Sequence, residues 1–299
     1  MPGRSLVFSD PEISGSTRVY GLIGNPVGHS LSPEIQNVAF RSIRLNAVYL
    51  TFPVREVELK WAIKGLKSLN VCGFNVTTPH KRAVLRYLDD VETRAAEIGS
   101  INTVKNEKGT LTGFNTDGDG VLNSMKAAGI RPEGKSVLLL GAGGAGRVIA
   151  YALVGRGYSL KIANRTESNA KRLAEFLYGK FGHKIEVIPL TKKALKETVN
   201  HSDIVLNASS MGMDEKHNPP INKRWIRDDQ WIFDIVYRPV RTKLLQDAAS
   251  AGARTINGLD MLVHQGACSF TLWTGKKAPI HQMRRTLTKK LSSENAAGR

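Results

Sequence analysis

A glycine-rich segment at residues 141–146 could bind a dinucleotide. The segment contains the pattern G-x-G-x-x-G, after an apolar run at 137–140 that predicts a strand and before an apolar run at 148–154 that predicts a helix. Glycine at these positions lets the backbone turn tightly and approach a pyrophosphate, whose charge the helix N-terminus stabilises. The residues that we expect to contact the cofactor here are Gly141, Ala142, Gly143, Gly144 and Ala145.

The residues that follow the next predicted strand indicate which dinucleotide binds. They are Asn164, Arg165 and Thr166. A site for NAD usually carries Asp or Glu here, because a carboxylate accepts a hydrogen bond from the ribose 2′-hydroxyl. A guanidinium instead binds a phosphate through paired hydrogen bonds. We therefore expect NADP rather than NAD, with Arg165 as the residue that selects it.

Lys81 and Asp117 are the candidates for handling a proton. The chain has no Tyr-x-x-x-Lys pair and no H-E-x-x-H motif, and its only cysteines are Cys72 and Cys268, so a carboxylate or an amine must act. Lys81 follows the predicted strand 73–76, near the start of a helix that Thr78-Pro79 is expected to open. Ligands of open α/β sheets bind beyond the carboxyl ends of strands. The positive end of such a helix would also disfavour a protonated amine.

The elements that must position these groups alternate between strand and helix. In the first half, strands are predicted at 19–23, 48–52 and 73–76, and helices at 59–69, from the cap-plus-proline pair Ser32-Pro33, and from Thr78-Pro79. The second half begins with a helix from Asp117 to about 128. It continues with strands at 136–140, 158–163, 185–188, 204–207 and 231–235 and helices at 147–154 and 168–178. This alternation predicts an α/β fold with mainly parallel sheets covered by helices.

The same pattern suggests how the chain divides. We expect a flexible leader at 1–17, a substrate-binding and catalytic domain at 18–117, and a Rossmann-type NADP domain at 118–257. Helices at 258–299, among them those from Met261 onward, have no strand of their own and are expected to pack on the first domain.

Length and composition exclude several classes of protein. The chain has 299 residues, of which 41% are hydrophobic, enough to bury the core of one large domain or two ordinary ones. Two cysteines rule out a disulfide scaffold and fit a reducing compartment. No apolar run approaches the roughly 18 residues of a membrane span, and the N-terminus lacks the apolar core of a signal peptide. We therefore expect a cytoplasmic protein with no membrane partner.

The net charge of +17 is compatible with nucleic acid, an anionic surface or anionic small molecules. The basic residues are scattered, and no zinc-finger or aromatic-basic ribonucleoprotein motif occurs. They are densest near the C-terminus, at Lys276, Lys277, Arg284, Arg285, Lys289 and Lys290. We expect a small-molecule substrate and no nucleic acid. A nucleic-acid binder is the alternative, and it predicts tight, steeply salt-dependent binding of DNA or RNA.

Ordered motifs between residues 19 and 291 resemble the shikimate dehydrogenase family, which includes shikimate/quinate dehydrogenases. The motifs are Gly24-Asn25-Pro26 with Ser30-Leu31-Ser32-Pro33, Asn75-Val76-Thr77-Thr78-Pro79-His80-Lys81, Gly99-Ser100-Ile101-Asn102-Thr103, Asn115-Thr116-Asp117-Gly118, the glycine-rich turn, Asn164-Arg165-Thr166, Asp234-Ile235-Val236-Tyr237-Arg238-Pro239 and the segment from Gly258 to Gln265. Two positions depart from the family pattern. Thr78 stands where an aliphatic residue is common, and Gly146 where Ala or Ser is usual.

The resemblance implies an NADP-dependent oxidoreductase that reversibly reduces 3-dehydroshikimate to shikimate, on the route to chorismate and the aromatic amino acids. It also implies two α/β domains with the active site in the cleft between them, a monomer or homodimer, and no metal. The family's catalytic lysine and aspartate fall on Lys81 and Asp117, and which of them transfers the proton stays open. Its substrate-binding positions fall on Ser30, Ser32, Thr77, Asn102, Tyr237 and Gln265, and further cofactor positions on Ile235 and Gly258.

Two alternatives lie close to this interpretation. A quinate/shikimate dehydrogenase would accept quinate, with its additional hydroxyl, and would be less strict in its choice of cofactor. A few pocket atoms decide such preferences. A non-catalytic NADP-binding regulator would be expected to lack Lys81 or Asp117, and both are present.

Overall fold

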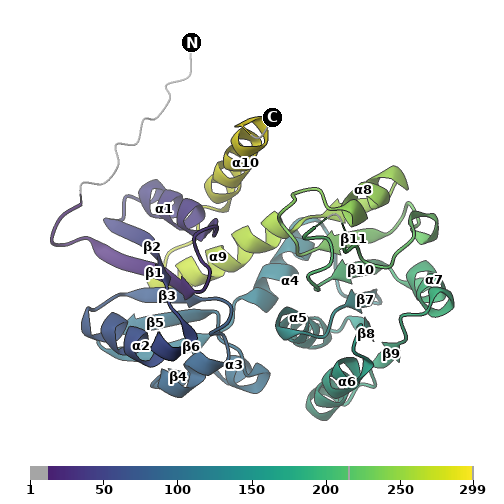
Figure 1. Ribbon diagram of the computed structural model, residues 1–299, viewed down its shortest axis with the longest axis horizontal. Helices are drawn as coiled ribbons and strands as arrows, with labels where there is room; N and C mark the ends of the chain where they lie inside the picture. The colour runs from purple at the N-terminus through teal and green to yellow at the C-terminus, as the bar shows by residue number, and fades with distance from the viewer. Residues whose placement is uncertain (1–12, 215, 298–299) are drawn as a thin grey trace. The chain divides into compact units, whose positions relative to one another are not determined.

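The computed structural model describes residues 13–214 and 216–297, and in it the chain divides into two compact units (Figure 1). The first unit combines the chain up to Thr116 with the chain from Gly266 onward, and the second is Asp117–Gln265. Most of the expected leader at 1–17 lies outside the described residues. Its last residues form a turn in which the Thr17 amide donates to the Ser14 carbonyl (3.0 Å) and the Thr17 hydroxyl donates to Asn46 (2.8 Å).

The first unit contains a six-stranded mixed sheet in the order β2-β1-β3-β5-β6-β4. Its strands are β1 (Arg18–Gly24), β2 (Ala47–Pro53), β3 (Gly73–Val76), β4 (Asp90–Val91), β5 (Thr103–Glu107) and β6 (Thr110–Phe114). The first three run parallel, as predicted, whereas β5 and β6 form an antiparallel hairpin that we did not predict. Lys108 and Gly109 join its strands, and both have positive φ (52° and 87°), the conformation that suits a tight two-residue hairpin turn.

The helices of this unit correct two local predictions. They are α1 (Ser32–Ser42), α2 (Leu59–Ser68), α3 (Thr93–Ile98), the end of α9 (Gly258–Thr274) and α10 (Ile280–Ala297). Ser32 is not the N-cap of α1. Leu31 holds that position without a side-chain hydrogen bond, and Ser32 is the first helical residue.

The predicted helix at Thr78-Pro79 is also wrong. That peptide bond is cis, residues 78–82 form a turn, and only a short 3-10 helix, Ala83–Tyr87, follows. Contacts with other segments take up the turn's polar groups: the Ile101 amide donates to the Lys81 carbonyl (2.7 Å), and the His80 ring binds the Val54 carbonyl (2.6 Å). The dipole of an α-helix therefore does not act on Lys81.

Both faces of this sheet are covered. One face packs with α2 into an aliphatic core that includes Ile23, Ile63 and Val76. On the other face Tyr20, Phe40, Tyr49, Phe270 and Trp273 pack in ring-to-ring contact. The Trp273 indole also donates to the Val104 carbonyl (2.9 Å), which ties α9 to the sheet.

The second unit is a doubly wound sheet of six parallel strands in the order β12-β11-β10-β7-β8-β9. The strands are β7 (Ser136–Leu140), β8 (Ser159–Ala163), β9 (Glu186–Ile188), β10 (Ile204–Asn207), β11 (Trp231–Asp234) and β12 (Arg254–Ile256). The strand order reverses between β7 and β10, the point at which such folds bind ligands. The predicted Rossmann-type domain is thus confirmed.

Alternation along β7 shows how the sheet is buried. Val137 and Leu139 belong to one hydrophobic cluster, Leu138 and Leu140 to another, and all four side chains are buried. The covering helices are α4 (Asp117–Ala127), α5 (Gly144–Val154), α6 (Glu167–Phe181), α7 (Lys192–His201) and α8 (Lys243–Ser250). Helix α5 begins three residues before its predicted start, and α9 likewise begins at Gly258 rather than at Met261.

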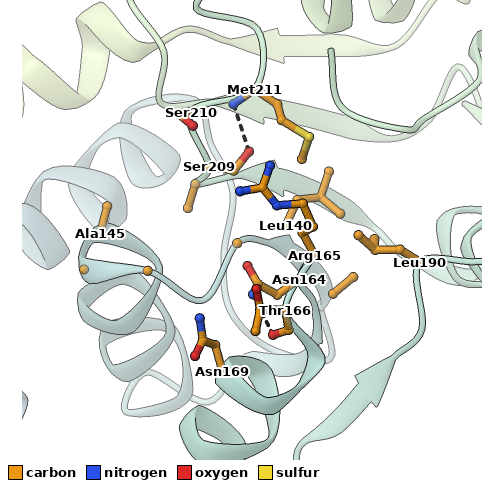
Figure 2. A pocket seen from close by; sticks show the side chains of 15 residues that line it. Leu140, Ala145, Asn164, Arg165, Thr166, Asn169, Leu190, Ser209, Ser210 and Met211 are labelled. Atoms are coloured by element: carbon orange, nitrogen blue, oxygen red, sulfur yellow. Dashed lines mark hydrogen bonds between the residues drawn. The ribbon is translucent and has the colours of Figure 1, made fainter. Parts of the chain in front are cut away.

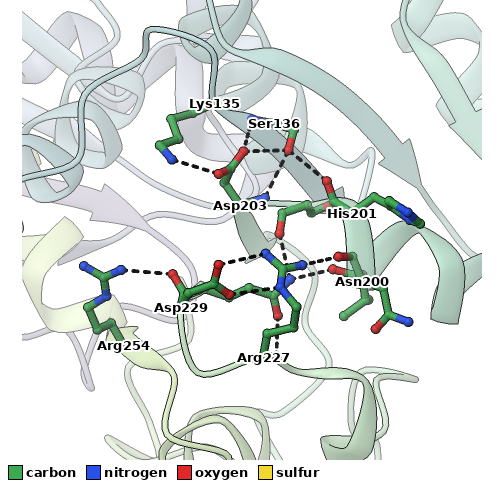
Figure 3. Close-up of polar contacts among 11 residues, drawn as sticks. Lys135, Ser136, Asn200, His201, Asp203, Arg227, Asp229 and Arg254 are labelled. Atoms are coloured by element: carbon green, nitrogen blue, oxygen red, sulfur yellow. Dashed lines mark hydrogen bonds and ion pairs between the residues drawn. The ribbon is translucent and has the colours of Figure 1, made fainter.

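At their amino ends β7 and β10 are joined by Asp203 (Figure 3). Its carboxylate accepts hydrogen bonds from the Ser136 amide (2.9 Å), the Ser136 hydroxyl (2.8 Å) and the Lys135 ammonium (2.8 Å). This contact lies at the opposite end of the strands from the glycine-rich turn. No helix among the described residues is long and apolar enough to span a membrane.

Candidate active site

A cavity of about 290 Å³ opens at the carboxyl ends of β7, β8 and β10 in the second unit (Figure 2). Three segments surround it: the glycine-rich turn, the segment after β8, and residues 208–211 after β10. The lining residues are Leu140, Gly141, Gly143, Gly144, Ala145, Ala163, Asn164, Arg165, Thr166, Asn169, Leu190, Ala208, Ser209, Ser210 and Met211. None of them is acidic, and Arg165 supplies a positive charge. The cavity is therefore suited to an anion.

The glycine-rich turn has two positions where only glycine fits. Gly141 has φ of +110°, which side chains rarely tolerate, and a Cβ on it would lie 3.0 Å from the backbone of Ala208. A Cβ on Gly146 would lie 2.2 Å from the carbonyl oxygen of Gly141. Gly143 and Gly144 are instead exposed, with open space around them, so their backbone is accessible to a ligand.

Asn164 connects this turn to the segment that carries Arg165. Its side-chain oxygen accepts a hydrogen bond from the Ala142 amide (3.0 Å), and its side-chain nitrogen donates to the Thr166 carbonyl (2.8 Å). Arg165 itself is exposed, and in Figure 2 its guanidinium extends toward the Ser209 side of the cavity. Asn164 thus fixes the position from which Arg165 reaches the cavity.

The other predicted residues of this unit do not line the cavity. Asp117 is the first residue of α4 and is buried, while Ile235 and Tyr237 follow β11 and are half-buried. A Cβ on Gly258 would lie 2.2 Å from the carbonyl oxygen of Ile235, so glycine is required where α9 begins beside this segment. The Gln265 amide donates to the Leu262 carbonyl (3.0 Å) within α9.

In the first unit, the loops after β1 and β3 lie side by side. The Thr77 amide donates to the Ile23 carbonyl (3.0 Å), and the Asn25 amide donates to the Thr78 carbonyl (3.0 Å). Gly24 makes this approach possible, because a Cβ there would lie 2.3 Å from the methyl group of Thr77. The loop after β1 continues to the predicted residues Ser30 and Ser32, where the Ser30 hydroxyl accepts from the Ser32 amide (3.2 Å).

Asn102 is held in a buried polar network. Its side-chain oxygen accepts from the Thr116 amide (2.8 Å) and the Thr103 hydroxyl (2.9 Å), and its side-chain nitrogen donates to the Thr116 hydroxyl (3.0 Å). The network continues through Asn75, whose amide donates to the Asn102 carbonyl (3.0 Å) and whose oxygen accepts from Tyr49 (2.8 Å). Burial raises the pKa of Tyr49, so its hydroxyl remains a neutral donor. Asn102 is therefore rigidly placed beside the residue that precedes Asp117.

Sequence reasoning missed several residues that shape the two units. Ser209, Ser210 and Met211 line the cavity, yet the only prediction made for this region was the strand that ends at Asn207. The position of these residues after a parallel strand was a usable signal, because ligands bind beyond the carboxyl ends of such strands. The network partners Asn75, Thr103 and Ser269 were not predicted either, because they come together only in the folded chain.

Three family models match the chain. The shikimate dehydrogenase substrate binding domain matches residues 22–104, the shikimate / quinate 5-dehydrogenase model matches 125–243, and the shikimate 5′-dehydrogenase C-terminal domain matches 258–288. The "shikimate dehydrogenase (NADP(+))" of Moorella thermoacetica is 45% identical over 293 residues, which cover 96% of this chain and 99% of that protein.

Solved structures agree with these matches. The crystal structure of shikimate dehydrogenase from Aquifex aeolicus has a TM-score of 0.84 and 40% identity, and covers 92% of this chain and 99% of its own. A crystal structure of a shikimate dehydrogenase in complex with NADP+ has a TM-score of 0.87 and 37% identity, with 94% and 98% covered. The chain therefore belongs to the shikimate dehydrogenase family.

Proposed function

We propose that this protein is an NADP-dependent shikimate dehydrogenase, which reversibly reduces 3-dehydroshikimate to shikimate on the route to chorismate and the aromatic amino acids. The observation that carries the proposal is the acid-free cavity at the glycine-rich turn, with Arg165 at its edge, in a chain of this family. Residues 118–257 would provide most of the contacts to the cofactor, and residues 18–117 with 258–299 most of those to the substrate; Gly258 and Tyr237 are the exceptions.

The cofactor binds through its phosphates. The exposed backbone of Gly143 and Gly144, at the start of α5, receives the pyrophosphate, whose charge the helix N-terminus stabilises. Arg165 binds the 2′-phosphate, together with Thr166 and beside the Asn164 side chain that positions both. The remaining cofactor contacts are assigned to Gly141, Ala142, Ala145, Ile235 and Gly258.

The substrate binds through neutral hydrogen-bonding groups. Ser30 and Ser32 bind its carboxylate with hydroxyl groups rather than with a single ion pair, and the ring hydroxyls are met by hydroxyl and amide side chains. These are assigned to Thr77, Asn102, Tyr237 and Gln265. Hydrogen bonds to Thr116 and Thr103 keep the Asn102 side chain in one orientation.

Lys81 and Asp117 manage the proton at the substrate oxygen. NADPH, when bound, supplies the hydride that reduces the ketone carbon. Negative charge then develops on the oxygen, where the Lys81 ammonium stabilises it or donates a proton. The Asp117 carboxylate accepts a hydrogen bond from the hydroxyl group that forms when this oxygen is protonated. A hydrogen bond from the Ile101 amide to the Lys81 carbonyl holds the backbone of the turn that carries this side chain.

The proposal extends to the cellular setting. We assign the enzyme to the cytoplasm, as a monomer or homodimer that binds small molecules and no nucleic acid. Cys72 and Cys268 form no disulfide, which fits a reducing compartment. Quinate dehydrogenase activity is the second candidate, and the names of the curated relatives do not favour it. A substrate panel of shikimate and quinate with NADP+ and NAD+ separates the two.

Substitution of Lys81 tests the catalytic assignment. Lys81→Ala should lower kcat by ~10²-fold or more, with the KM for 3-dehydroshikimate little changed, because general acid–base catalysis has this scale. Arg82→Ala removes an exposed positive charge from the same turn and should leave kcat within about two-fold. Near-normal turnover in Lys81→Ala, measured by NADPH oxidation, would remove Lys81 from the mechanism.

A further inference from the structure

Asp234, the last residue of β11, is a fully buried carboxylate whose partners are neutral. Its Oδ2 accepts a hydrogen bond from the Thr242 hydroxyl (2.7 Å), and its Oδ1 accepts from the Asn207 amide (2.9 Å) and the Val236 backbone amide (3.1 Å). Within the described residues no cation pairs with it. Burying a carboxylate in this way is costly, so its three donors must be fixed firmly around it.

The Asn207 side chain connects Asp234 to the cavity described above. Asn207 ends β10, and its side chain also donates to the Met211 carbonyl (2.8 Å). The Asn207 side-chain oxygen accepts from both the amide (3.1 Å) and the hydroxyl (2.6 Å) of Ser209. In turn the Ser209 hydroxyl accepts from the Met211 amide (3.2 Å), as Figure 2 shows. The conformation of residues 208–211, which line the cavity, thus depends on the side chain that Asp234 orients.

The Val236 backbone amide fixes the segment after β11. The Val236 amide binds Asp234 directly, and the Ile235 amide donates to the Asn207 carbonyl (3.1 Å). Gly258 lies so close to Ile235 that any Cβ would collide with its carbonyl. The segment that carries Ile235 is therefore held between β10 and the start of α9, with little freedom to shift.

The side chain of Thr242, the remaining donor, is also buried. The Thr242 hydroxyl donates to Asp234 while it accepts from the Leu245 amide (3.4 Å) as the N-cap of α8. An ionised carboxylate only accepts hydrogen bonds, so it can satisfy donors from three segments at once. Burial raises the pKa of Asp234, and the hydrogen bonds from Thr242, Val236 and Asn207 act against that rise. An amide in its place would turn an NH2 group toward one of the donors.

We propose that Asp234 is a positioning residue of the cofactor site, which holds residues 208–211 and 235–236 in the conformation that binds NADP(H). The inference rests on the proposed function, because it assigns this cavity to the cofactor. Asp234 does not touch the cavity itself and acts through Asn207 and Val236.

The test is direct NADP+ binding, measured by titration calorimetry on the full-length protein in the absence of substrate. Asp234→Asn should raise the Kd for NADP+ by about ten-fold at unchanged stoichiometry of the folded protein. Asp228→Asn, an exposed Asp in the same unit, is the matched control and should change Kd by less than two-fold. A fold defect alone would lower the stoichiometry and leave the Kd of the folded fraction unchanged.

A second pair of variants serves if Asp234→Asn fails to fold. Thr242→Val removes one donor and should weaken NADP+ binding several-fold. Thr242→Ser retains the hydroxyl and should bind NADP+ as the wild type does. If folded Asp234→Asn binds NADP+ with the same Kd as the wild type, or if both Thr242 variants have equal Kd, this inference is overturned while the proposed function stands. Failure of the wild-type protein to bind NADP+ would overturn the proposed function and this inference with it.

Discussion

We expect single side chains to decide which cofactor the second unit prefers. The Arg165 side chain is exposed, but the backbone on either side of it is fixed. The Asn164 side chain accepts a hydrogen bond from the Ala142 amide and donates one to the Thr166 carbonyl. The neighbours of Arg165 around the cavity include no carboxylate that would pair with the guanidinium in place of a ligand phosphate. A charge-assisted, paired hydrogen bond to a phosphate is therefore available to it.

Substitution of Arg165 should change cofactor preference more than turnover. Arg165→Gln should raise the KM for NADPH about 10- to 100-fold, because a hydrogen bond to a charged group contributes about 1.5–3 kcal/mol. The KM for NADH, which lacks the 2′-phosphate, should change less than three-fold. Steady-state kinetics with both cofactors measure this, and an equal loss with NADPH and NADH would show that Arg165 does not read the phosphate. Lys161→Gln, on the preceding strand, is the control for loss of a nearby positive charge.

At the residue scale the sequence was informative where a side chain has one dominant use. Arg165 after a predicted strand indicated NADP, and this prediction agrees with the names of the relatives. Asn102 was expected in the site only through the family resemblance, and Asp234 was not expected there, because the hydrogen bonds that hold them come from other elements of the fold, such as those with Thr116 and Asn207. Those partners are set by the fold and carry no local pattern.

Turns and strand ends set the geometry at the scale of elements. The structure shows why glycine is needed at position 146: a Cβ there would lie 2.2 Å from the Gly141 carbonyl oxygen. Helix α5 therefore approaches the glycine-rich turn too closely for any side chain. Relief of that contact would require the helix and the turn to separate.

Gly146→Ala should weaken NADPH binding by ten-fold or more and lower the thermal midpoint, because overpacking of this kind costs typically 1–3 kcal/mol. Gly179→Ala is the matched control. It lies inside α6 with open space around its Cβ position, so it should preserve binding and stabilise the fold by roughly 0.4–1 kcal/mol. Thermal unfolding with and without NADP+ measures both variants. Unaltered cofactor affinity in Gly146→Ala would show that the turn can open without loss.

The hydrogen bonds of Asp203, which join β7 and β10, should make the free energy of unfolding depend on pH in the acidic range. Partial burial raises the pKa of Asp203, but hydrogen bonds from Lys135 and Ser136 outweigh this and lower the pKa to about 2. Because an unfolded Asp has a pKa near 3.9, the stabilisation is complete above about pH 4 and is lost as the pH falls toward 2. The side chain is one-third exposed, so solvent screening leaves about 1 kcal/mol.

Urea unfolding at several pH values checks this expectation. Asp203→Asn should lower the free energy of unfolding by about 1 kcal/mol at pH 7, and its difference from the wild type should narrow between pH 4 and pH 3. Asp228→Asn, in the same unit, controls for the loss of one negative charge. A difference that stays constant down to pH 3 would mean that ionisation of Asp203 contributes nothing.

Elements were predicted best where an apolar run or a regular apolar spacing marks them in the sequence. The parallel strands β1, β3, β7 and β10 and the helices α2 and α6 were expected close to their observed bounds. The Lys81 turn was not, because a cap-plus-proline pair describes only the local chain. Contacts from Val54 and Ile101 decide its conformation instead. The β5–β6 hairpin was also missed, since its turn depends on two residues of positive φ.

The whole molecule carries a net charge of +17, whereas its proposed substrate and cofactor are both anions. A positive field raises the rate at which anions encounter the protein, and salt screens that field. The densest group of basic residues lies on exposed side chains of α10 and the turn before it, and it includes Lys276, Lys277, Arg285 and Lys289.

Catalytic efficiency should therefore fall as ionic strength rises. Between 20 and 300 mM salt, kcat/KM for NADPH should drop several-fold, with kcat nearly constant. A variant with Gln at the four exposed positions 276, 277, 285 and 289 should show a shallower slope. Parallel slopes would indicate that only charges near the cavity matter, and a flat wild-type profile would rule out steering altogether.

The first unit draws on both ends of the chain, and this has a consequence for synthesis on the ribosome. Gly73 in β3 leaves a notch that the Trp273 indole fills, and that indole also binds Val104. Residues 117–265 emerge earlier and can fold as each strand appears, whereas the notch stays open until α9 has been translated. We therefore expect the nascent protein to fold its second unit while the sheet of the first unit is still incomplete, and the translation of α9 to set the time at which that sheet is completed.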